Sequence, residues 1–134
     1  MRMRVCGLLA GLLFELALVA PAAAAGGAAA PYTPAGGTAA QYRQWITAAR
    51  ALYPYPEPAA KMIRVMLCES GGNRLAVGSG RWYGLFQYVP STWHGRWNPY
   101  RASSIYDAKA QIFATAKAWS IGMQHQWSCY ALTR

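Results

Sequence analysis

The chain has 134 residues and a formal net charge of +9, which comes from 13 Lys and Arg against only 4 Asp and Glu. So basic a composition indicates polyanionic partners. Beyond the first 25 residues no segment is apolar over the roughly 20 residues that a membrane-spanning helix needs, which excludes a main domain that crosses a membrane.

The first 25 residues are predicted to be a secretory signal peptide. Two arginines lie among the first four residues, and an almost wholly apolar run follows from residue 5 to residue 20. That run is short for a membrane span, and small side chains follow at residues 23–25, so we expect cleavage after about Ala25. Glu15 interrupts the apolar run, and an uncleaved signal-anchor remains the alternative.

Export would limit the choice of partners. The signal peptide takes with it two of the 13 basic residues and one of the 4 acidic ones, which leaves a net charge of +8. A periplasmic or secreted protein meets few nucleic acids, so we expect its polyanions to be cell-wall polymers and membrane surfaces, without stable insertion into a membrane. We expect a monomer.

Two segments follow the predicted signal peptide. Residues 26–40 are rich in Gly, Ala, Pro and Thr and lack apolar periodicity, which predicts a flexible linker. Residues 41–134 are long enough to form one domain with a single modest core.

The mature chain keeps two cysteines, Cys68 and Cys129, because Cys6 lies in the predicted signal peptide. In an oxidising compartment an isolated pair is most simply a disulfide. Zinc is the alternative, with His94 and His125 as further ligands, but neither histidine has close metal-ligand spacing to a cysteine. We therefore expect a disulfide, no metal and no cofactor.

Helices dominate the first half of the predicted domain. Apolar side chains recur at intervals of three and four over residues 39–52, which predicts an amphipathic helix. Pro58 begins a second helix that runs to about Ser70, where Gly71 and Gly72 stop it.

The second half is more irregular. We predict a loop or short hairpin over residues 73–82, a brief helix over residues 90–93 and irregular chain over residues 98–104. Asp107 is expected to cap a third major helix that ends near Ile121. Its buried side is expected to comprise Ile105, Ala108, Ile112, Ala116 and Trp119. The predicted fold class is α+β and predominantly α-helical.

Glu69 is the predicted catalytic residue. It falls at the C-terminal end of the second helix, where the helix dipole disfavours a negative charge, on the same stripe as Met62 and Met66. Burial and the dipole should both raise the pKa of its carboxyl group, which is how a carboxylic acid stays protonated near neutral pH and acts as a general acid. The alternative is a Glu69 that turns to solvent or pairs with Arg64 or Arg74.

An aromatic-rich segment follows the predicted acid. Between residues 82 and 106 the aromatic side chains are Trp82, Tyr83, Phe86, Tyr88, Trp93, Trp97, Tyr100 and Tyr106. Some of them must pack in the core, and the rest could stack on sugar faces, whose C–H groups meet the electron-rich face of a ring. Trp82, Tyr83 and Trp93 are the candidates for sugar contacts, with core packing as the alternative for each.

Three short motifs resemble the core signature of the lysozyme-like superfamily, in particular its lytic transglycosylase domain. They are Glu69, Ser70, Gly71, Gly72 and Asn73; then Tyr83, Gly84, Leu85, Phe86 and Gln87; then Pro90, Ser91, Thr92 and Trp93. The Gly-Gly-Asn stretch, the Thr-Trp pair and the Trp-x-Cys ending are also similar to the resuscitation-promoting factors. The resemblance covers about residues 58–129.

The resemblance implies a cleft that binds peptidoglycan glycan strands. It assigns Glu69 as the single catalytic acid, Ser70 as its neighbouring hydroxyl and Gln87 as a polar residue of the cleft wall. Together with Asn73, Tyr83, Trp93 and Trp119, Ser70 and Gln87 are the candidate substrate-binding residues. In that family the acid protonates the oxygen between N-acetylmuramic acid and N-acetylglucosamine and then, as a carboxylate, accepts the proton of the muramic 6-hydroxyl. The product is a 1,6-anhydro sugar, and no water is consumed.

The carboxylate count is compatible with such a one-acid mechanism. Glycosidases that use water usually need a second carboxylate roughly 5 to 9.5 Å from the first. Glu57 and Asp107 are available, but each has a structural explanation at the start of a helix. A hydrolytic muramidase and a non-catalytic wall-binding module remain the alternatives.

The sequence also departs from the family pattern. The family also has a motif with a Tyr on a late helix, which none of the three motifs above includes. The nearest equivalent here ends in Trp119, which either replaces that Tyr or packs in the core. Phe86 stands where Met is commonest, a change of similar volume that we expect to be tolerated.

Overall fold

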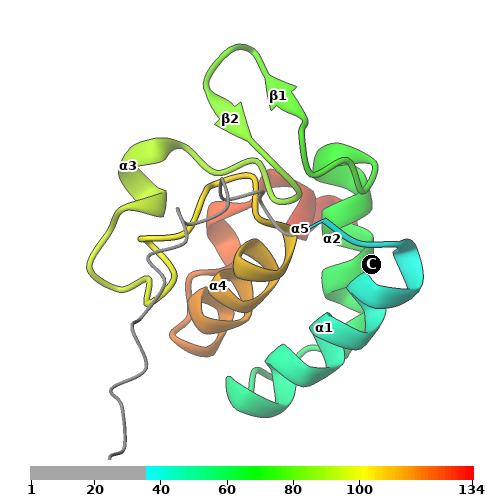
Figure 1. Cartoon of the computed structure of the whole chain (residues 1–134). Helices are drawn as coiled ribbons and strands as arrows, with labels where there is room; N and C mark the ends of the chain where they lie inside the picture. Colours follow the sequence, from blue (N-terminus) through cyan, green and yellow to red (C-terminus); the bar gives the residue numbers. More distant parts are fainter. Residues whose placement is uncertain (1–35) are drawn as a thin grey trace, which may run out of the picture. The chain divides into compact units, whose positions relative to one another are not determined.

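The structure, a computed structural model, describes residues 36–134, so the predicted signal peptide and the linker up to residue 35 lie outside the described residues. Within this range the chain forms a small, mostly helical domain with five α-helices and a two-stranded antiparallel hairpin (Figure 1). The elements are α1 (Ala39–Leu52), α2 (Ala59–Ser70), β1 (Val77–Gly78), β2 (Trp82–Tyr83), α3 (Pro90–Trp93), α4 (Ala108–Ser120), the 3-10 helix η1 (Gln124–Gln126) and α5 (Ser128–Leu132). The predicted α+β, predominantly helical class is confirmed.

The helix boundaries follow local chemistry. Thr38 caps α1, and its side chain and that of Gln41 bond each other's backbone N–H groups in a capping box. The helix α2 ends at Gly71, whose φ of 64° is left-handed and therefore suits glycine. Asp107 caps α4 by accepting a hydrogen bond from the backbone N–H of Ala110. The predicted starts and ends of these three helices are confirmed to within about one residue.

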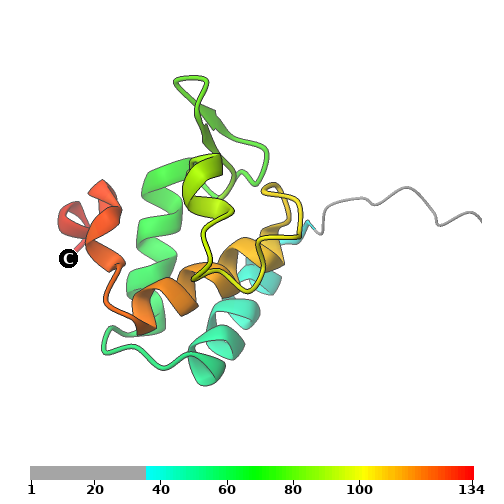
Figure 2. The same cartoon turned by 90° about the vertical axis from the view of Figure 1, so that its left-hand side faces the viewer.

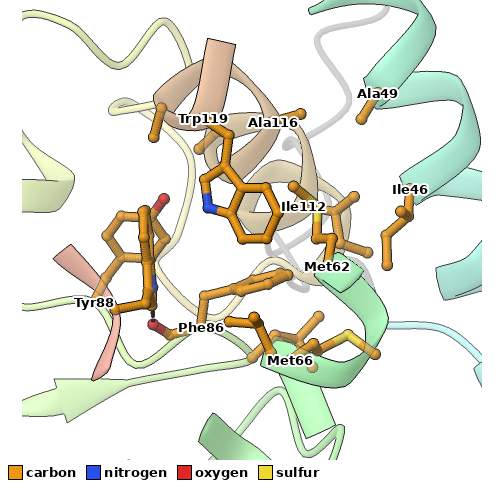
Figure 3. Close-up of a cluster of buried hydrophobic side chains, with 14 of the residues drawn as sticks. Ile46, Ala49, Met62, Met66, Phe86, Tyr88, Ile112, Ala116 and Trp119 are labelled. Carbon is orange, nitrogen blue, oxygen red and sulfur yellow. Dashed lines mark hydrogen bonds between the residues drawn. The ribbon is translucent and has the colours of Figure 1, made fainter. Parts of the chain in front are cut away.

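The helix α4 lies at the centre of the domain. Four residues predicted for its buried side, Ala108, Ile112, Ala116 and Trp119, are buried, whereas Ile105 lies before the helix and is only partly buried. The helix residues Ala110, Gln111, Ala114, Thr115 and Ala118 are buried too. The prediction of one buried side was incomplete, because five alanines allow α1 and the loops around α4 to approach it closely from several directions. Figure 3 shows Ile112, Ala116 and Trp119 of α4 facing side chains of α1, α2 and the segment that carries Phe86.

The hairpin stands above the helices in both views of the domain (Figures 1 and 2). Its strands pair Val77 with Tyr83 and Gly78 with Trp82. The hairpin predicted for residues 73–82 is therefore confirmed, and it extends by one residue to Tyr83.

The predicted disulfide is confirmed. Cys68 and Cys129 are bonded, and their Cα atoms lie 5.9 Å apart. The bond joins the last turn of α2 to α5, which lies beside α2 in Figure 2. Among residues 36–134 we find no helix with the length and hydropathy of a membrane span.

Candidate active site

Glu69 is half-buried in the last turn of α2. Burial raises the pKa of its carboxyl group above the ordinary value, and a hydrogen bond from the backbone N–H of Cys129 opposes that rise. The distance from this nitrogen to Oε1 of Glu69 is 3.3 Å. Because Oε1 accepts this N–H, the proton of a neutral Glu69 belongs on Oε2. The geometry is that of a carboxylic acid able to donate a proton.

Glu69 lines a cleft of about 450 Å³, a volume in the range of small-ligand sites. The lining comprises Glu69, Trp82, Gln87, Tyr88, Val89, Thr92, Met123, Gln126, Trp127 and Ser128. These residues come from the end of α2, from β2, from residues 87–89 between β2 and α3, from α3 and from the tail that follows α4. Glu69 is the one carboxylate among them.

The tail forms a wall of the cleft through Trp127. Its indole N–H donates a hydrogen bond of 2.8 Å to the backbone carbonyl of Phe86, and its ring lies edge-on to that of Tyr88, with 5.5 Å between the ring centroids. The hydroxyl of Tyr88 is in turn bonded to Thr115 on α4. Both rings are buried and fixed by polar contacts, so this wall is rigid and connected directly to the core.

Trp82 is the exposed aromatic side chain of the cleft. It lies on β2 with 39% of its surface exposed, and the guanidinium of Arg81 lies 5.7 Å from its ring centroid. A flat, partly exposed ring at the rim of a cleft is suited to stacking on a sugar ring. Of the three aromatic candidates for sugar contacts, Trp82 is the one that the structure brings into the cleft lining.

Gln87 lines the cleft and also positions the hairpin. Its backbone φ of 50° is unusual for a residue other than glycine. Its side-chain N–H group donates a hydrogen bond of 2.9 Å to the carbonyl of Gly84, and its side-chain oxygen lies where a Cβ at residue 78 would be, only 2.2 Å away. Gly78 is therefore needed for Gln87 to hold this geometry.

Three further predicted residues lie outside the cleft lining. Ser70 bonds the carbonyl of Met66 and accepts the N–H of Gly72, which completes the end of α2. The side-chain oxygen of Asn73 accepts the N–H of Leu75, 2.9 Å away. Tyr83 packs its half-buried ring against Tyr106. The structure gives all three residues a local structural role next to the site.

Trp93 and Trp119, both predicted as possible substrate contacts, lie in the core. Trp93 is fully buried, and its indole N–H donates a hydrogen bond of 3.1 Å to the carbonyl of Ser103. Trp119 is 1% exposed, with its ring edge-on to the rings of Tyr55 and Tyr130. Neither ring has a face open to a ligand. Both residues therefore pack in the core, which was the alternative to substrate contact for each.

The other two carboxylates of the described chain lie away from the cleft lining. Glu57 precedes α2 and accepts a hydrogen bond from the hydroxyl of Tyr130. Because α2 has 12 residues, a rise of 1.5 Å per residue separates its two ends by about 18 Å. Asp107 caps α4 and is buried. Glu57 is too far from Glu69 for the spacing that paired glycosidase carboxylates use.

Sequence reasoning missed the residues that complete the site. Met123, Gln126 and Ser128 line the cleft with Trp127, although the Trp-x-Cys ending pointed only to the last part of this segment. Another residue that sequence reasoning missed, Gln111, is fully buried on α4 and bonds the backbone of the segment from Tyr83 to Phe86. The sequence did contain a signal for Gln111, because it is a polar residue inside a helix that is otherwise rich in alanine.

Gln111 holds the base of the hairpin in place. Its side-chain oxygen accepts the N–H of Phe86 at 2.9 Å, and its side-chain nitrogen donates to the carbonyls of Tyr83, at 3.0 Å, and Ile105. A Cβ at residue 84 would lie 2.0 Å from this nitrogen, so only glycine fits at Gly84. The core helix thus sets the position of both Trp82 and Gln87.

Neither a metal site nor a match to a known protein adds to this description of the cleft. Among residues 36–134 no group of three or more His, Cys, Asp or Glu side chains could hold a metal ion. No protein-family model, no curated protein and no solved structure matches the chain.

Proposed function

We propose that this protein is an exported peptidoglycan lytic transglycosylase with a lysozyme-like fold, and that Glu69 is its single catalytic acid. The observation that carries the proposal is the position of Glu69: it is half-buried, has a raised pKa, and is the one carboxylate that lines a cleft of about 450 Å³. Each of the three motifs that resemble those of lytic transglycosylases contributes one residue to the cleft lining, namely Glu69, Gln87 and Thr92, which supports the proposal.

The chemistry needs one carboxyl group in two successive roles. Oε2 of neutral Glu69 donates its proton to the oxygen that bridges N-acetylmuramic acid and N-acetylglucosamine, and the bond from C1 to this oxygen breaks. The substrate's own N-acetyl group assists at C1. Glu69, now a carboxylate, accepts the proton of the muramic 6-hydroxyl as O6 bonds to C1. The acid is restored, and the anhydro product forms without water.

The absence of a second carboxylate from the cleft lining argues against hydrolysis. A muramidase that activates water with a base needs a carboxylate within roughly 9.5 Å of the acid, on the far side of the sugar. Glu57 lies at the opposite end of α2 and Asp107 caps α4. A single-acid mechanism is therefore the better fit to this cleft.

The cell-wall location rests on two features. The disulfide between Cys68 and Cys129 is typical of oxidising compartments, and the predicted signal peptide provides a route to them. The net charge of the chain should favour encounter with the anionic wall, so binding to sacculi is expected to weaken as salt rises.

The test is mass spectrometry of purified sacculi after digestion by the wild-type protein and by Glu69→Gln. Anhydro-muropeptides from the wild type alone would support the proposal. Reducing-end products, about 18 daltons heavier by the addition of one water, would instead identify a hydrolase. No product from either protein, together with retained binding to sacculi, would favour a non-catalytic wall-binding module.

A further inference from the structure

The central helix α4 reaches the surface along a single stripe. Four of its residues are not buried, Lys109, Phe113, Lys117 and Ser120, and the first three are spaced at i, i+4 and i+8 on one face. We call Lys109, Phe113 and Lys117 the lysine stripe. Two of the three lysines of residues 36–134 therefore lie on the only part of α4 that a partner could contact.

Aromatic rings lie beside the lysines of the stripe, two from α1 and its C-terminal end and one from the stripe itself. The ammonium of Lys109 lies 6.0 Å from the ring centroid of Trp45 and 5.9 Å from that of Phe113. The ammonium of Lys117 lies 5.7 Å from the ring centroid of Tyr53. These cation–π contacts hold both charges close to the surface instead of leaving them on freely moving chains. Cations and partly buried rings thus lie close together where the exposed side of α4 meets α1.

A cavity of about 320 Å³ adjoins the stripe. It is lined by Tyr100, Ser103, Asp107, Lys109, Ala110 and Phe113. The one carboxylate in this lining, that of Asp107, is buried and accepts the N–H of Ala110. None of these residues lines the cleft of Glu69, so the two sites are separate.

The chemistry of the stripe selects a class of partner. Eight residues of helix place the Cα atoms of Lys109 and Lys117 about 12 Å apart along the axis, which suits an extended polymer with repeated charges. Half-buried rings such as Trp45 and Phe113 offer faces to sugar C–H groups but do not protrude as an anchor in a lipid surface would. The net positive charge of the chain favours an anionic partner.

We propose that the lysine stripe binds an acidic polysaccharide chain. Its sugar rings pack on Trp45 and Phe113, and its carboxylates pair with Lys109 and Lys117. This binding needs no chemistry at Glu69, and it would tether the protein to a polyanionic polysaccharide while the cleft remains open for its own ligand.

The test is isothermal titration of the full chain with an oligogalacturonate, which carries a carboxylate on every ring, and with its uncharged methyl ester. The acid form is expected to bind and the ester to bind more weakly. Lys109→Gln/Lys117→Gln should weaken binding of the acid form about tenfold, since two charge contacts at the surface are lost. Arg64→Gln/Arg134→Gln removes the same charge elsewhere on the surface and should change the affinity by about twofold or less.

Several results would overturn the proposal. These are no binding of the acid form, equal binding of the methyl ester, or an equal loss in the two double variants. Glu69→Gln should bind as the wild type does, and a loss there would place the polysaccharide in the cleft instead. Tighter binding of a single-stranded oligonucleotide of equal charge, abolished by the same lysine changes, would show that the partner is of another class.

Discussion

Oε1 of Glu69 accepts a hydrogen bond from the backbone N–H of Cys129, 60 residues further along the chain. The disulfide of Cys129 ends at Cys68, the residue directly before Glu69. The covalent bond and the hydrogen bond therefore hold the same two segments together, with the candidate acid between them.

The activity should depend on the protonation of Glu69. Because burial raises the pKa of this carboxyl group above its ordinary value, the neutral acid persists to higher pH than an exposed glutamate would. The rate of anhydro-muropeptide formation should fall as pH rises through this raised pKa, and below that pKa Glu69→Gln should lower the rate by about 10²-fold to 10⁴-fold. A rate that is flat across the pH profile would contradict the assignment.

The same shift makes a prediction for stability. Since the folded state holds the proton of Glu69 more tightly than the unfolded state does, the stability that Glu69 contributes is lost as pH rises through the raised pKa. Glu69→Gln should therefore melt at a higher temperature than the wild type at neutral pH. The difference should vanish near pH 4, about the pKa of an unfolded glutamate. Thermal unfolding followed by circular dichroism at both pH values measures it.

Removal of the disulfide should cost stability. Cys68 and Cys129 are separated by 61 residues, and closing a loop of this length stabilises the folded state by about 4 kcal/mol in the chain-entropy model. Cys68→Ser/Cys129→Ser should show this loss in urea unfolding, and it should also reduce activity by releasing the N–H that bonds Glu69. A reductant should destabilise the wild type but leave the double variant unchanged.

Gln111→Leu should destabilise the domain by about 2 kcal/mol, because it leaves the N–H of Phe86 buried without its partner and removes one of the two hydrogen bonds to the carbonyl of Tyr83, which keeps the one from the N–H of Tyr88. Urea unfolding measures the change. Gln44→Leu, on the exposed face of α1, is the matched control and should change stability by about 0.5 kcal/mol or less. Equal effects of the two substitutions would mean that Gln111 does not hold the hairpin.

Trp82→Ala should weaken substrate binding with little effect on folding, since the ring is partly exposed at the rim of the cleft. Loss of stacking worth about 1 kcal/mol should raise the KM for glycan strands roughly fivefold and leave kcat nearly unchanged. Trp82→Phe keeps a ring and should retain most of the affinity. A large fall in kcat with an unchanged KM would contradict a binding role.

The helices and their ends could be predicted from the sequence alone. Apolar periodicity, Pro58, Gly71 and Asp107 are local signals, because a helix begins and ends according to the hydrogen bonds of its own terminal residues. The disulfide could be predicted for a similar reason, since only two cysteines remain outside the predicted signal peptide.

The cleft was predictable only in part. Glu69 and Gln87 were named from their motifs and do line it, whereas Trp93 and Trp119 proved to be core residues. The sequence does not distinguish an aromatic side chain that packs in the core from one that stacks on a ligand. Burial depends on which segments meet in space, and the tail with Trp127 meets the hairpin only after folding.

The sequence by itself therefore determined the class of the domain, the limits of its main helices, the disulfide and the identity of the candidate acid. Only the tertiary structure decided which residues surround that acid, that Gln111 fixes the hairpin from within the core, and that Glu57 and Asp107 stay out of the cleft. The reason is physical: helix signals act over a few residues, whereas the cleft is built from segments brought together by packing.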